Sequence, residues 1–520
     1  MRRRNRGLVG GFRLDAPRLQ GRRGLRGVTA GMGCQSRQYH DAHGVQLDMT
    51  QAASQWTMRI SLLKALTYAA DGLWTHWGGR RRIDARQLSR LRGLVETARR
   101  DSPMFRRLYA DLPQSDQINL ADLPVTRKPD LMGQFDDWLT IRSLPLEKAR
   151  AHLNDMKNVG VPVGDVAVLQ TSGTSGEPAV IVLPSAFVEY YFGIMMARFE
   201  RYHWALIRDL RKRGVRVTIT GGNGHFAGNG FNKLVQNVNP RLARGLGLNF
   251  VEAEQSIDRL VDEMNAIPDV VWIVTYPSML SVLVREKEAG RLKIEPALFS
   301  TGGETLTNDL QARTLRAFPS LTYGIADFYG CTECLALSFT CSHGRKHLNE
   351  DWVILEAVDK AMQPVPDGTL SDTVLLTVLA NEVQPFIRYD LGDCVRFHTD
   401  ACPCGSPFRS FDVEGRQATL VRVGEVSLSP LVFDLEHDQA RRAQLVQTAE
   451  RAFEVRIQLA EGAAEGPVFD AVIATVKGVF RDNGLADVTV TACDAPPAFT
   501  ASGKFHEVVP LKSSDARNMI

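Results

Sequence analysis

The sequence predicts an α/β protein. We expect a large multi-layer domain with mostly parallel sheets flanked by helices and a β-rich subdomain, followed by a small α+β domain. Three observations predict this: the length of 520 residues, strand-like and helix-like segments that alternate in mid-chain, and a change of pattern near residue 415. A chain of this length exceeds what one ordinary hydrophobic core supports. Hydrophobic residues at 44% and charged residues at 23% are ordinary for a globular protein, and no apolar run is long enough for a membrane span.

The first 48 residues differ from the rest in charge. They contain ten arginines and three acidic residues, whereas residues 49–520 carry 52 basic and 56 acidic side chains. We interpret residues 1–48 as a disordered or non-native extension, with an Arg-rich organelle transit peptide as the alternative. The remainder has no basic excess, so we expect no nucleic-acid partner.

Apolar spacing predicts the elements of the large domain, 49–415. Helical periodicity predicts helices over 56–73 and 88–109. Two apolar runs predict strands at 166–170 and 179–183, and a long helix is expected at 186–213. Further expected strands are 215–220, 248–253, 270–276 and 297–301, and the expected helices between them are 256–265, 278–289 and 308–318. This alternation is typical of a parallel sheet covered by helices.

The pattern changes twice toward the C-terminus. Residues 351–397 are strand-rich, with turns such as Pro366-Asp367-Gly368. After Gly415-Arg416 a shorter α+β pattern follows, so we place a small mobile domain at 416–520. Within it we expect a helix near 440–453 and strands near 468–475 and 488–491.

A loop of small and hydroxyl residues separates the first two strands. It consists of Thr171, Ser172, Gly173, Thr174, Ser175 and Gly176. Backbone N–H and hydroxyl donors of such a turn can converge on a polyphosphate without side-chain clashes. The G-x4-G-K-[ST] signature of P-loop enzymes is absent. Taken alone, the loop has a plain hairpin turn as its alternative.

Other weak motifs follow in a definite order. They are Thr301-Gly302-Gly303-Glu304, Tyr329-Gly330-Cys331-Thr332-Glu333, Arg388-Tyr389-Asp390-Leu391-Gly392-Asp393, Gly415-Arg416 and Ser502-Gly503-Lys504-Phe505. Together with the loop they resemble the core motifs of the adenylate-forming superfamily of acyl-CoA ligases, luciferases and peptide-synthetase adenylation domains. Within it, the chain most resembles the phenylacetate–CoA ligase (CapK-like) branch. The likeness covers about residues 85–510.

The resemblance implies a cytoplasmic enzyme that activates a carboxylic acid with ATP and Mg²⁺. An aryl or arylacetic acid is favoured, the intermediate is an acyl-adenylate, pyrophosphate is released, and coenzyme A takes the acyl group. Two alternatives stay open. One is transfer to a carrier protein, an amine or another nucleophile, and the other is a non-catalytic nucleotide-binding protein. A homodimer is also open.

The resemblance assigns nucleotide-binding roles. Residues 171–176 cradle the β- and γ-phosphates, and Gly302, Gly303 and Glu304 line the adenine. Tyr329, followed by Gly330, stacks on the adenine ring. Asp393 takes both ribose hydroxyls, a bidentate task suited to a carboxylate, and Arg416 reaches the ribose or phosphate.

Three further residues carry the chemistry in this reading. Thr332 contacts the α-phosphate, and Glu333 holds Mg²⁺, a hard cation that prefers oxygen ligands. Lys504 bridges the acid and the α-phosphate and stabilises the charge that gathers there. The chain departs from the family at Glu177, where lysine is common, and at Gln417-Ala418-Thr419, where the usual acidic pair is missing. Asp390-Leu391 likewise replaces the commoner Arg-Thr.

Eight cysteines are too few for a secreted disulfide scaffold, so we expect a reducing compartment. Cys341, His347, Cys402 and Cys404 offer three thiolates and an imidazole, the ligands of a closed structural Zn²⁺ site. His343 or Cys334 are alternative ligands, and free cysteines are the alternative to any metal.

The acyl pocket is expected around the stretch 221–228, which follows a strand. By resemblance, His225, Phe226 and Tyr276 line this pocket, with core packing as the alternative for the aromatic residues. The stretch also contains G-x-G-x-x-A, a pattern found in Rossmann dinucleotide sites. It stands alone here, and the other motifs favour an adenylation site instead.

Overall fold

A computed structural model describes residues 57–115, 117–171, 178–198, 206, 208–209, 214–221, 224–245, 248–304, 306–416, 421–424, 426–428, 430–435, 437–499 and 505–511. All of them belong to one unit, residues 50–520. The extension 1–48 lies outside these residues. None of the helices in the described ranges combines the length and the apolar character that a bilayer span requires.

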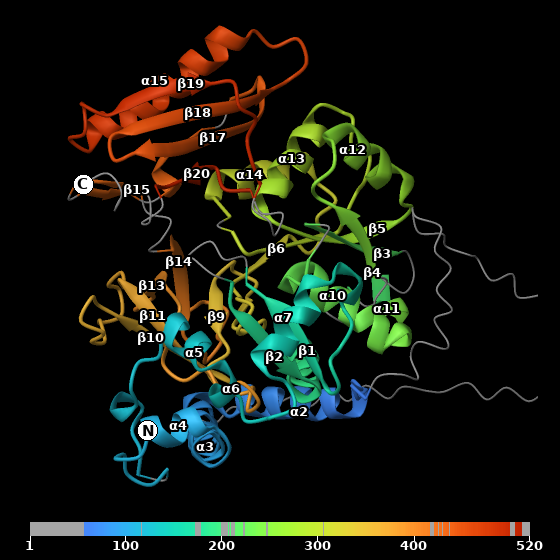
Figure 1. Cartoon of the computed structure of the whole chain (residues 1–520). Coiled ribbons are helices and arrows are strands. Elements are labelled where there is room, and N and C mark those ends of the chain that lie inside the picture. The colour runs from blue at the N-terminus through green and yellow to red at the C-terminus, as the bar shows by residue number, and fades with distance from the viewer. Residues whose placement is uncertain are drawn as a thin grey trace, which may run out of the picture. The chain divides into compact units, whose positions relative to one another are not determined.

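The first part of the described chain is helical (blue to cyan in Figure 1). Its helices are α2 (Leu62–Trp77), α3 (Gly79–Asp101), α4 (Pro103–Leu108), α5 (Lys128–Gly133), α6 (Phe135–Trp138) and α7 (Leu146–Asn154), with 3₁₀ turns at Leu120–Asp122 and Met156–Asn158. The two helices expected here correspond to α2 and to α3 with α4. Ser61 caps α2, because its side chain accepts a hydrogen bond from the Lys64 N–H.

A buried hairpin follows, made of antiparallel β1 (Val166–Gln170) and β2 (Val180–Pro184). Helix α8 (Ser185–Arg198) continues from β2 and packs along α2. Small residues allow this close approach: a Cβ added at Gly72 would lie 3.1 Å from the Ala197 Cβ. The part of the expected 186–213 helix that extends beyond α8 falls largely outside the described residues.

The predicted parallel sheet is confirmed. Its order is β4-β3-β5-β6-β7, and all its pairings are parallel. The strands are β3 (Val215–Thr220), β4 (Leu248–Glu252), β5 (Val270–Thr275), β6 (Leu298–Gly302) and β7 (Ile325–Phe328). The helices in this part are α10 (Ala227–Val238), α11 (Pro240–Gly245), α12 (Ile257–Ala266), α13 (Pro277–Glu288) and α14 (Asn308–Ala317). Because the strands are parallel, their carboxyl ends meet at one edge of the sheet.

The strand-rich part forms two antiparallel sheets (yellow to orange in Figure 1). One has the order β10-β11-β12 and the other β13-β14-β9-β8. The strands are β8 (Ser338–Thr340), β9 (Lys346–Leu348), β10 (Val353–Val358), β11 (Thr373–Val378), β12 (Tyr389–Asp390), β13 (Asp393–Phe397) and β14 (Ser410–Arg416). In the second sheet, Asp393 at the start of β13 pairs with Arg416 at the end of β14.

The C-terminal part has a four-stranded sheet, β19-β18-β17-β20, with α15 packed against β18 and β19. A separate hairpin precedes it. The elements are β15 (Val421–Val423), β16 (Val426–Leu428), a 3₁₀ turn (Pro430–Val432), β17 (Ala440–Ala449), β18 (Ala452–Leu459), α15 (Glu465–Asp482), β19 (Thr489–Cys493) and β20 (Val508–Val509). An α+β pattern was expected here, and the sheet and helix agree with it.

Two individual elements of this part were predicted wrongly. The expected helix 440–453 is the strand β17 with the start of β18. It is a strand because β17 is hydrogen-bonded on both sides, by β18 and β20. The expected strand 468–475 lies inside α15, which buries Val468, Val472, Val476 and Phe480 at helical spacing. Both predictions followed the preferences of individual residues. The helical spacing of apolar residues decides the form of α15, and hydrogen bonding to partner strands decides that of β17.

Candidate functional site

The base of the expected phosphate loop is a closed hairpin end. The Thr171 N–H donates to the Ala179 carbonyl at 3.0 Å, and the Thr171 hydroxyl accepts from the Ala179 N–H at 2.8 Å. Thr171 therefore fixes the two strand ends between which the loop must run. Ser172, Gly173, Thr174, Ser175 and Gly176 lie outside the described residues, as does Glu177, so their phosphate role stays a prediction.

The same hairpin end joins the turn that was expected to line the acyl pocket. The Gln170 N–H donates to the His225 carbonyl at 2.9 Å. The His225 ring is buried, contacts the His152 ring edge-on at 5.4 Å and lies 3.2 Å from the Asp155 carbonyl. Burial lowers the pKa of His225, and burial together with the charge of His225 lowers the pKa of His152. His225, a member of this turn, is thus an enclosed imidazole whose lowered pKa favours the neutral form.

Phe226 and Tyr276 lie at the carboxyl ends of neighbouring strands. Phe226 precedes α10 after β3, and Tyr276 follows β5, which pairs with β3. The Tyr276 hydroxyl lies 3.2 Å from the Thr220 hydroxyl. A Cβ at Gly228 would lie 2.6 Å from that Thr220 oxygen and 3.1 Å from the Tyr276 oxygen. The absence of a side chain at Gly228 therefore lets α10 start against these two hydroxyls.

The glycine segment after β6 lies against β7. Gly302 pairs with Phe328, and a Cβ at Gly302 would lie 2.9 Å from both the Phe328 ring and its carbonyl oxygen. Gly303 has a φ of 80°, which favours glycine. Glu304 accepts from the Ser278 N–H at 2.9 Å and so caps the N-terminus of α13. The expected adenine-lining backbone thus lies at the sheet edge, and Glu304 also has a structural role.

The Tyr329 motif forms a tight turn directly after β7. The backbones of Cys331 and Cys334 exchange hydrogen bonds of 3.2 and 3.1 Å, which places Thr332 and Glu333 at the tip of the turn. Gly330 is required by a close approach, since a Cβ there would lie 2.9 Å from the Leu335 carbonyl oxygen.

Three of the expected nucleotide-binding residues come together at this turn. The Tyr329 hydroxyl donates to Asp393 Oδ2 at 2.5 Å. Asp393 and Glu333 are 3% and 5% exposed. Burial raises the pKa of the Cys331 thiol, and the charges of Glu333, Cys334 and Asp393 raise it further. Cys331 therefore lies within electrostatic reach of both carboxylates, so they share one neighbourhood.

Two expected residues cannot be placed in it. Arg416 is the backbone partner of Asp393, but its side chain is outside the described atoms. Lys504 is also outside the described residues. Their proposed contacts with nucleotide remain predictions.

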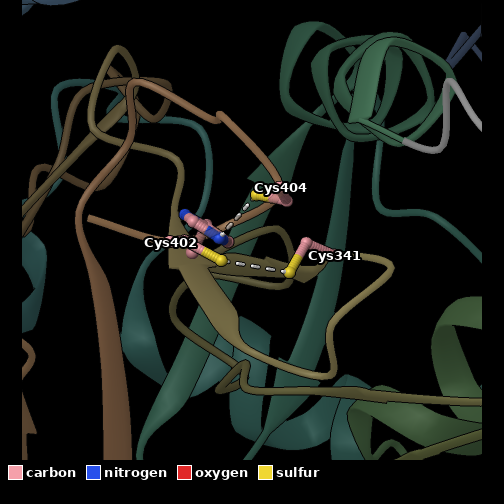
Figure 2. Close-up of side chains that lie close together, drawn as sticks. Cys341, Cys402 and Cys404 are labelled. Atoms are coloured by element: carbon pink, nitrogen blue, oxygen red, sulfur yellow. Dashed lines mark hydrogen bonds between the residues drawn. The ribbon is translucent and has the colours of Figure 1, made fainter. Parts of the chain in front are cut away.

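Four other expected residues form a compact cluster. The ligand atoms of Cys341, His347, Cys402 and Cys404 all lie within 4.8 Å of one another. Cys341 and His347 belong to the β8–β9 hairpin, whereas Cys402 and Cys404 lie in the turn before β14. The three thiols converge in Figure 2. The structure thus favours His347 over His343, and it places Cys334 beside Cys331 instead.

Two distances in this cluster match the edges of a tetrahedral zinc site. Zn–S bonds of about 2.3 Å and a Zn–N bond of about 2.0 Å give S···S edges of about 3.8 Å and S···N edges of about 3.5 Å. The Cys341 and Cys402 sulfurs are 3.7 Å apart, and the Cys404 sulfur lies 3.5 Å from His347 Nε2. Two of the six distances between ligand atoms therefore equal the edges of such a site, and all six are within 4.8 Å, so the four residues suit a zinc ion.

The surroundings also suit metal ligands. His347 Nδ1 lies 2.7 Å from the Phe408 carbonyl and so carries the proton, which leaves the Nε2 lone pair facing the sulfurs. Burial lowers the pKa of His347, which favours the neutral ligand form. Backbone N–H groups of His343 and Ser406 donate to the Cys341 and Cys404 sulfurs at 3.4 and 3.3 Å. Such donors stabilise thiolate charge.

The polar side chains of residues 349–351 form a buried network that the sequence did not predict. Arg198, at the end of α8, forms a buried pair with Asp351 at 2.7 Å and also donates to Asn349 at 2.9 Å. Glu350 accepts from the Arg409 N–H at 2.7 Å. These contacts tie α8 and the start of β14 to the segment after β9. The signal was the run of three polar residues shortly before the apolar strand β10.

A second network was not foreseen. The Ser338 hydroxyl accepts from the Tyr329 N–H at 2.8 Å and donates to the Tyr329 carbonyl at 2.9 Å. Asp327 accepts from Thr301 at 2.7 Å and pairs with Lys346 at 2.5 Å. The β8–β9 hairpin therefore contacts both β7, at Asp327, and the turn that follows it, at Tyr329. These partners belong to different strands and turns, so no local motif reveals them.

No protein-family model and no curated protein matches the chain. Solved structures do match its fold. A 2-hydroxyisobutyryl-CoA ligase, solved in the postadenylation state with 2-HIB-AMP, gives a TM-score of 0.56 at 17% identity over 82% of this chain and 90% of that chain. A GH3.15 acyl acid amido synthetase gives a TM-score of 0.55 at 12% identity over 84% and 92%. The chain thus shares its fold with an acyl-CoA ligase and an amido synthetase.

Proposed function

We propose that this protein activates a carboxylic acid with ATP in the cytoplasm, forms an acyl-adenylate, and transfers the acyl group to coenzyme A. The contact between Tyr329 and Asp393 beside the buried Glu333 is the observation that carries this proposal. It gathers an aromatic ring and two carboxylates at the carboxyl edge of a parallel sheet. The shared fold with a ligase solved with its acyl-AMP supports the same conclusion.

In the first step, a carboxylate oxygen of the substrate attacks the α-phosphorus and pyrophosphate leaves. Tyr329 stacks on the adenine, and Asp393 binds the ribose hydroxyls. Glu333 holds Mg²⁺, for which one carboxylate plus substrate phosphates is a typical ligand set. Thr332, beside Glu333 at the tip of the turn, contacts the α-phosphate.

The remaining roles rest on the sequence resemblance. Residues 171–176 hold the β- and γ-phosphates, Arg416 reaches the ribose, and Lys504 stabilises charge as the acid meets the phosphorus. Glu177 must point away from the phosphates, because two anions in contact repel. In the second step, the thiol of coenzyme A attacks the acyl carbonyl, a thioester forms and AMP leaves.

The proposed substrate is an aryl or arylacetic acid. Phe226 and Tyr276, at neighbouring strand ends, supply two aromatic faces that suit a flat apolar group. The buried ring of His225, next to Phe226 in the chain, supports this region. A test panel therefore starts with benzoate- and phenylacetate-type acids.

Transfer to an amine is the second candidate. The similar TM-score of the acyl acid amido synthetase favours keeping it, and the missing acidic pair after Arg416 weakens the case for the thioester step. Adenylation is common to both candidates, so only the acceptor distinguishes them.

We also propose that Cys341, His347, Cys402 and Cys404 bind one structural Zn²⁺. Four protein ligands leave no position for substrate, and this closed set is typical of structural sites. The ion would tie the β8–β9 hairpin to the turn before β14.

Pyrophosphate release across the acid panel, with and without coenzyme A, tests the function. We expect acid-dependent release together with a thioester product when coenzyme A is present. Adenylation followed by amide formation instead of a thioester would favour the second candidate. Intact protein that fails to bind ATP would refute both.

Lys504→Ala tests the proposed chemistry. Loss of one preorganised charge at the reacting centre costs about 10²–10³-fold in rate, so we expect acid-dependent pyrophosphate exchange to fall by that factor. Thioester formation from supplied acyl-AMP should change much less. Lys477→Ala, an exposed lysine on α15, is the control. Normal exchange by Lys504→Ala would contradict the assigned role.

A further inference from the structure

We propose that the Tyr329 hydroxyl is a positioning group that orients the Asp393 carboxylate for the ribose of the nucleotide. The inference rests on the proposed function and adds a second task for Tyr329. Its ring would recognise the base while its hydroxyl prepares the residue that recognises the sugar.

The geometry supports a fixed donor rather than a chance contact. The Tyr329 backbone is held through both its N–H and its carbonyl by the Ser338 hydroxyl. Its ring packs edge-on against Phe411 at 5.8 Å between centroids. With backbone and ring both held, the hydroxyl has a defined position, 2.5 Å from Asp393 Oδ2.

The acceptor is equally well held. Asp393 begins β13, pairs with Arg416 of β14 and is 3% exposed. The preceding Gly392 N–H donates to the Thr373 hydroxyl at 3.1 Å. The strand fixes the Asp393 backbone, and because the last torsion of an aspartate is broad, hydrogen bonds to the carboxylate decide the orientation of its plane.

A bidentate contact with two ribose hydroxyls depends on that plane. A hydroxyl donor bound to one carboxylate oxygen selects one orientation before the nucleotide arrives. The entropy lost when the carboxylate becomes ordered is then part of folding, so it does not reduce the affinity for ATP. If Tyr329 acts this way, its hydroxyl matters only for nucleotides whose ribose carries the hydroxyls that Asp393 recognises.

Tyr329→Phe tests the inference because it retains the ring and removes the hydroxyl. Dissociation constants are measured for ATP, 2′-deoxy-ATP and 3′-deoxy-ATP with the full chain and Mg²⁺. We expect affinity for ATP to fall by about tenfold, the usual effect of one hydrogen bond to a charged group. The loss for the two deoxy nucleotides should be less than about threefold, because each retains only one of the two hydroxyls and cannot make the bidentate contact.

Two further variants complete the experiment. Tyr323→Phe is the matched control, because Tyr323 also donates to an aspartate, Asp209 at 2.8 Å, outside the proposed site. It should leave all three affinities unchanged. In an Asp393→Asn background, Tyr329→Phe should have little additional effect on ATP affinity. This comparison uses only the ratios of ATP dissociation constants between correctly folded variants.

The outcomes separate the inference from the proposed function. Equal losses for ATP and the deoxy nucleotides, or no loss for ATP, would overturn the positioning role and leave nucleotide binding intact. Failure of the unaltered chain to bind any of the three nucleotides would instead overturn the proposed function. A purely structural Tyr329 hydroxyl would lower thermal stability without discriminating between the nucleotides, which also contradicts the inference.

Discussion

The buried imidazole pair His152 and His225 shows how single residues set the chemistry near the expected acyl region. Their rings are in contact, and the pKa of each is lowered, chiefly by burial. Both rings therefore bind a proton less readily in the folded protein than a free histidine does. His225 thereby offers a packed ring that favours the neutral form, in the turn that carries Phe226.

This pair predicts a pH dependence of stability. The unfolded chain binds protons at the ordinary histidine pKa of 6.5, whereas the folded chain resists them. The free energy of unfolding should therefore fall as the pH drops through this range, for example from about 7.5 to about 5.5. Urea unfolding at several pH values measures it.

His152→Gln provides the comparison. It removes one of the two groups, so the difference in unfolding free energy between high and low pH should become smaller. His437→Gln, an imidazole far from this pair in sequence, is the control and should retain the full dependence. An unchanged dependence in His152→Gln would show that other groups cause it.

The β8–β9 hairpin is the element that connects the metal cluster to the proposed nucleotide site. It carries Cys341 and His347 at the cluster, Ser338 at Tyr329, and Lys346 at Asp327 of β7, the strand that leads into the Tyr329 turn. Any loosening of the hairpin should therefore reach Tyr329. Loss of order in the metal cluster should therefore weaken nucleotide binding.

Metal removal tests this connection. Purified protein should contain about one zinc per chain, and a strong chelator or Cys404→Ser should lower both thermal stability and ATP affinity. The stability loss should be a fraction of the about 10–16 kcal/mol that zinc contributes to small zinc-finger peptides, because hydrophobic packing also holds this hairpin. Metal analysis, thermal unfolding and ATP titration measure the three effects.

Cys493→Ser is the matched control, because Cys493 lies on β19 and outside the cluster. It should retain zinc, stability and ATP affinity. Protein prepared without chelator that contains no zinc would refute the metal site. Retained ATP affinity after zinc loss would refute only its connection to Tyr329.

At the scale of the whole molecule, the hydrophobic core is divided. Among the described residues, three buried clusters lie between Met58 and Phe411, and a fourth lies between Val421 and Val508. None of these clusters crosses the proposed boundary at 415. We therefore propose that 49–415 and 416–520 are separate folding units.

Separate units predict two calorimetric unfolding transitions. Truncating a buried phenylalanine costs about 3–5 kcal/mol, and Phe453 and Phe299 are 1% and 0% exposed. Phe453→Ala should lower the temperature of one transition and Phe299→Ala that of the other. One cooperative transition that shifts as a whole under either change would contradict the boundary.

The sequence predicts an element correctly when the element's own residues determine its form, and fails when partner strands determine it. The parallel sheet was predicted because each strand and helix carries its own apolar pattern, and sequential β-α units leave few arrangements. The strand β17 was missed because its residues favour a helix and only β18 and β20 impose the extended form. In α15 the valines suggested a strand, yet the spacing of Val468, Val472, Val476 and Phe480 already indicated a helix.

The sequence by itself determined the fold class and the candidate residues, because residue types and local spacing record backbone preference and chemistry. Only the tertiary structure decided which candidates meet: the Tyr329 hydroxyl with Asp393, Cys341 and His347 with Cys402 and Cys404, and Arg198 with Asp351. Each of these contacts joins residues more than 50 positions apart. Long-range contact depends on how sheets and hairpins pack, and no local pattern of residues specifies that.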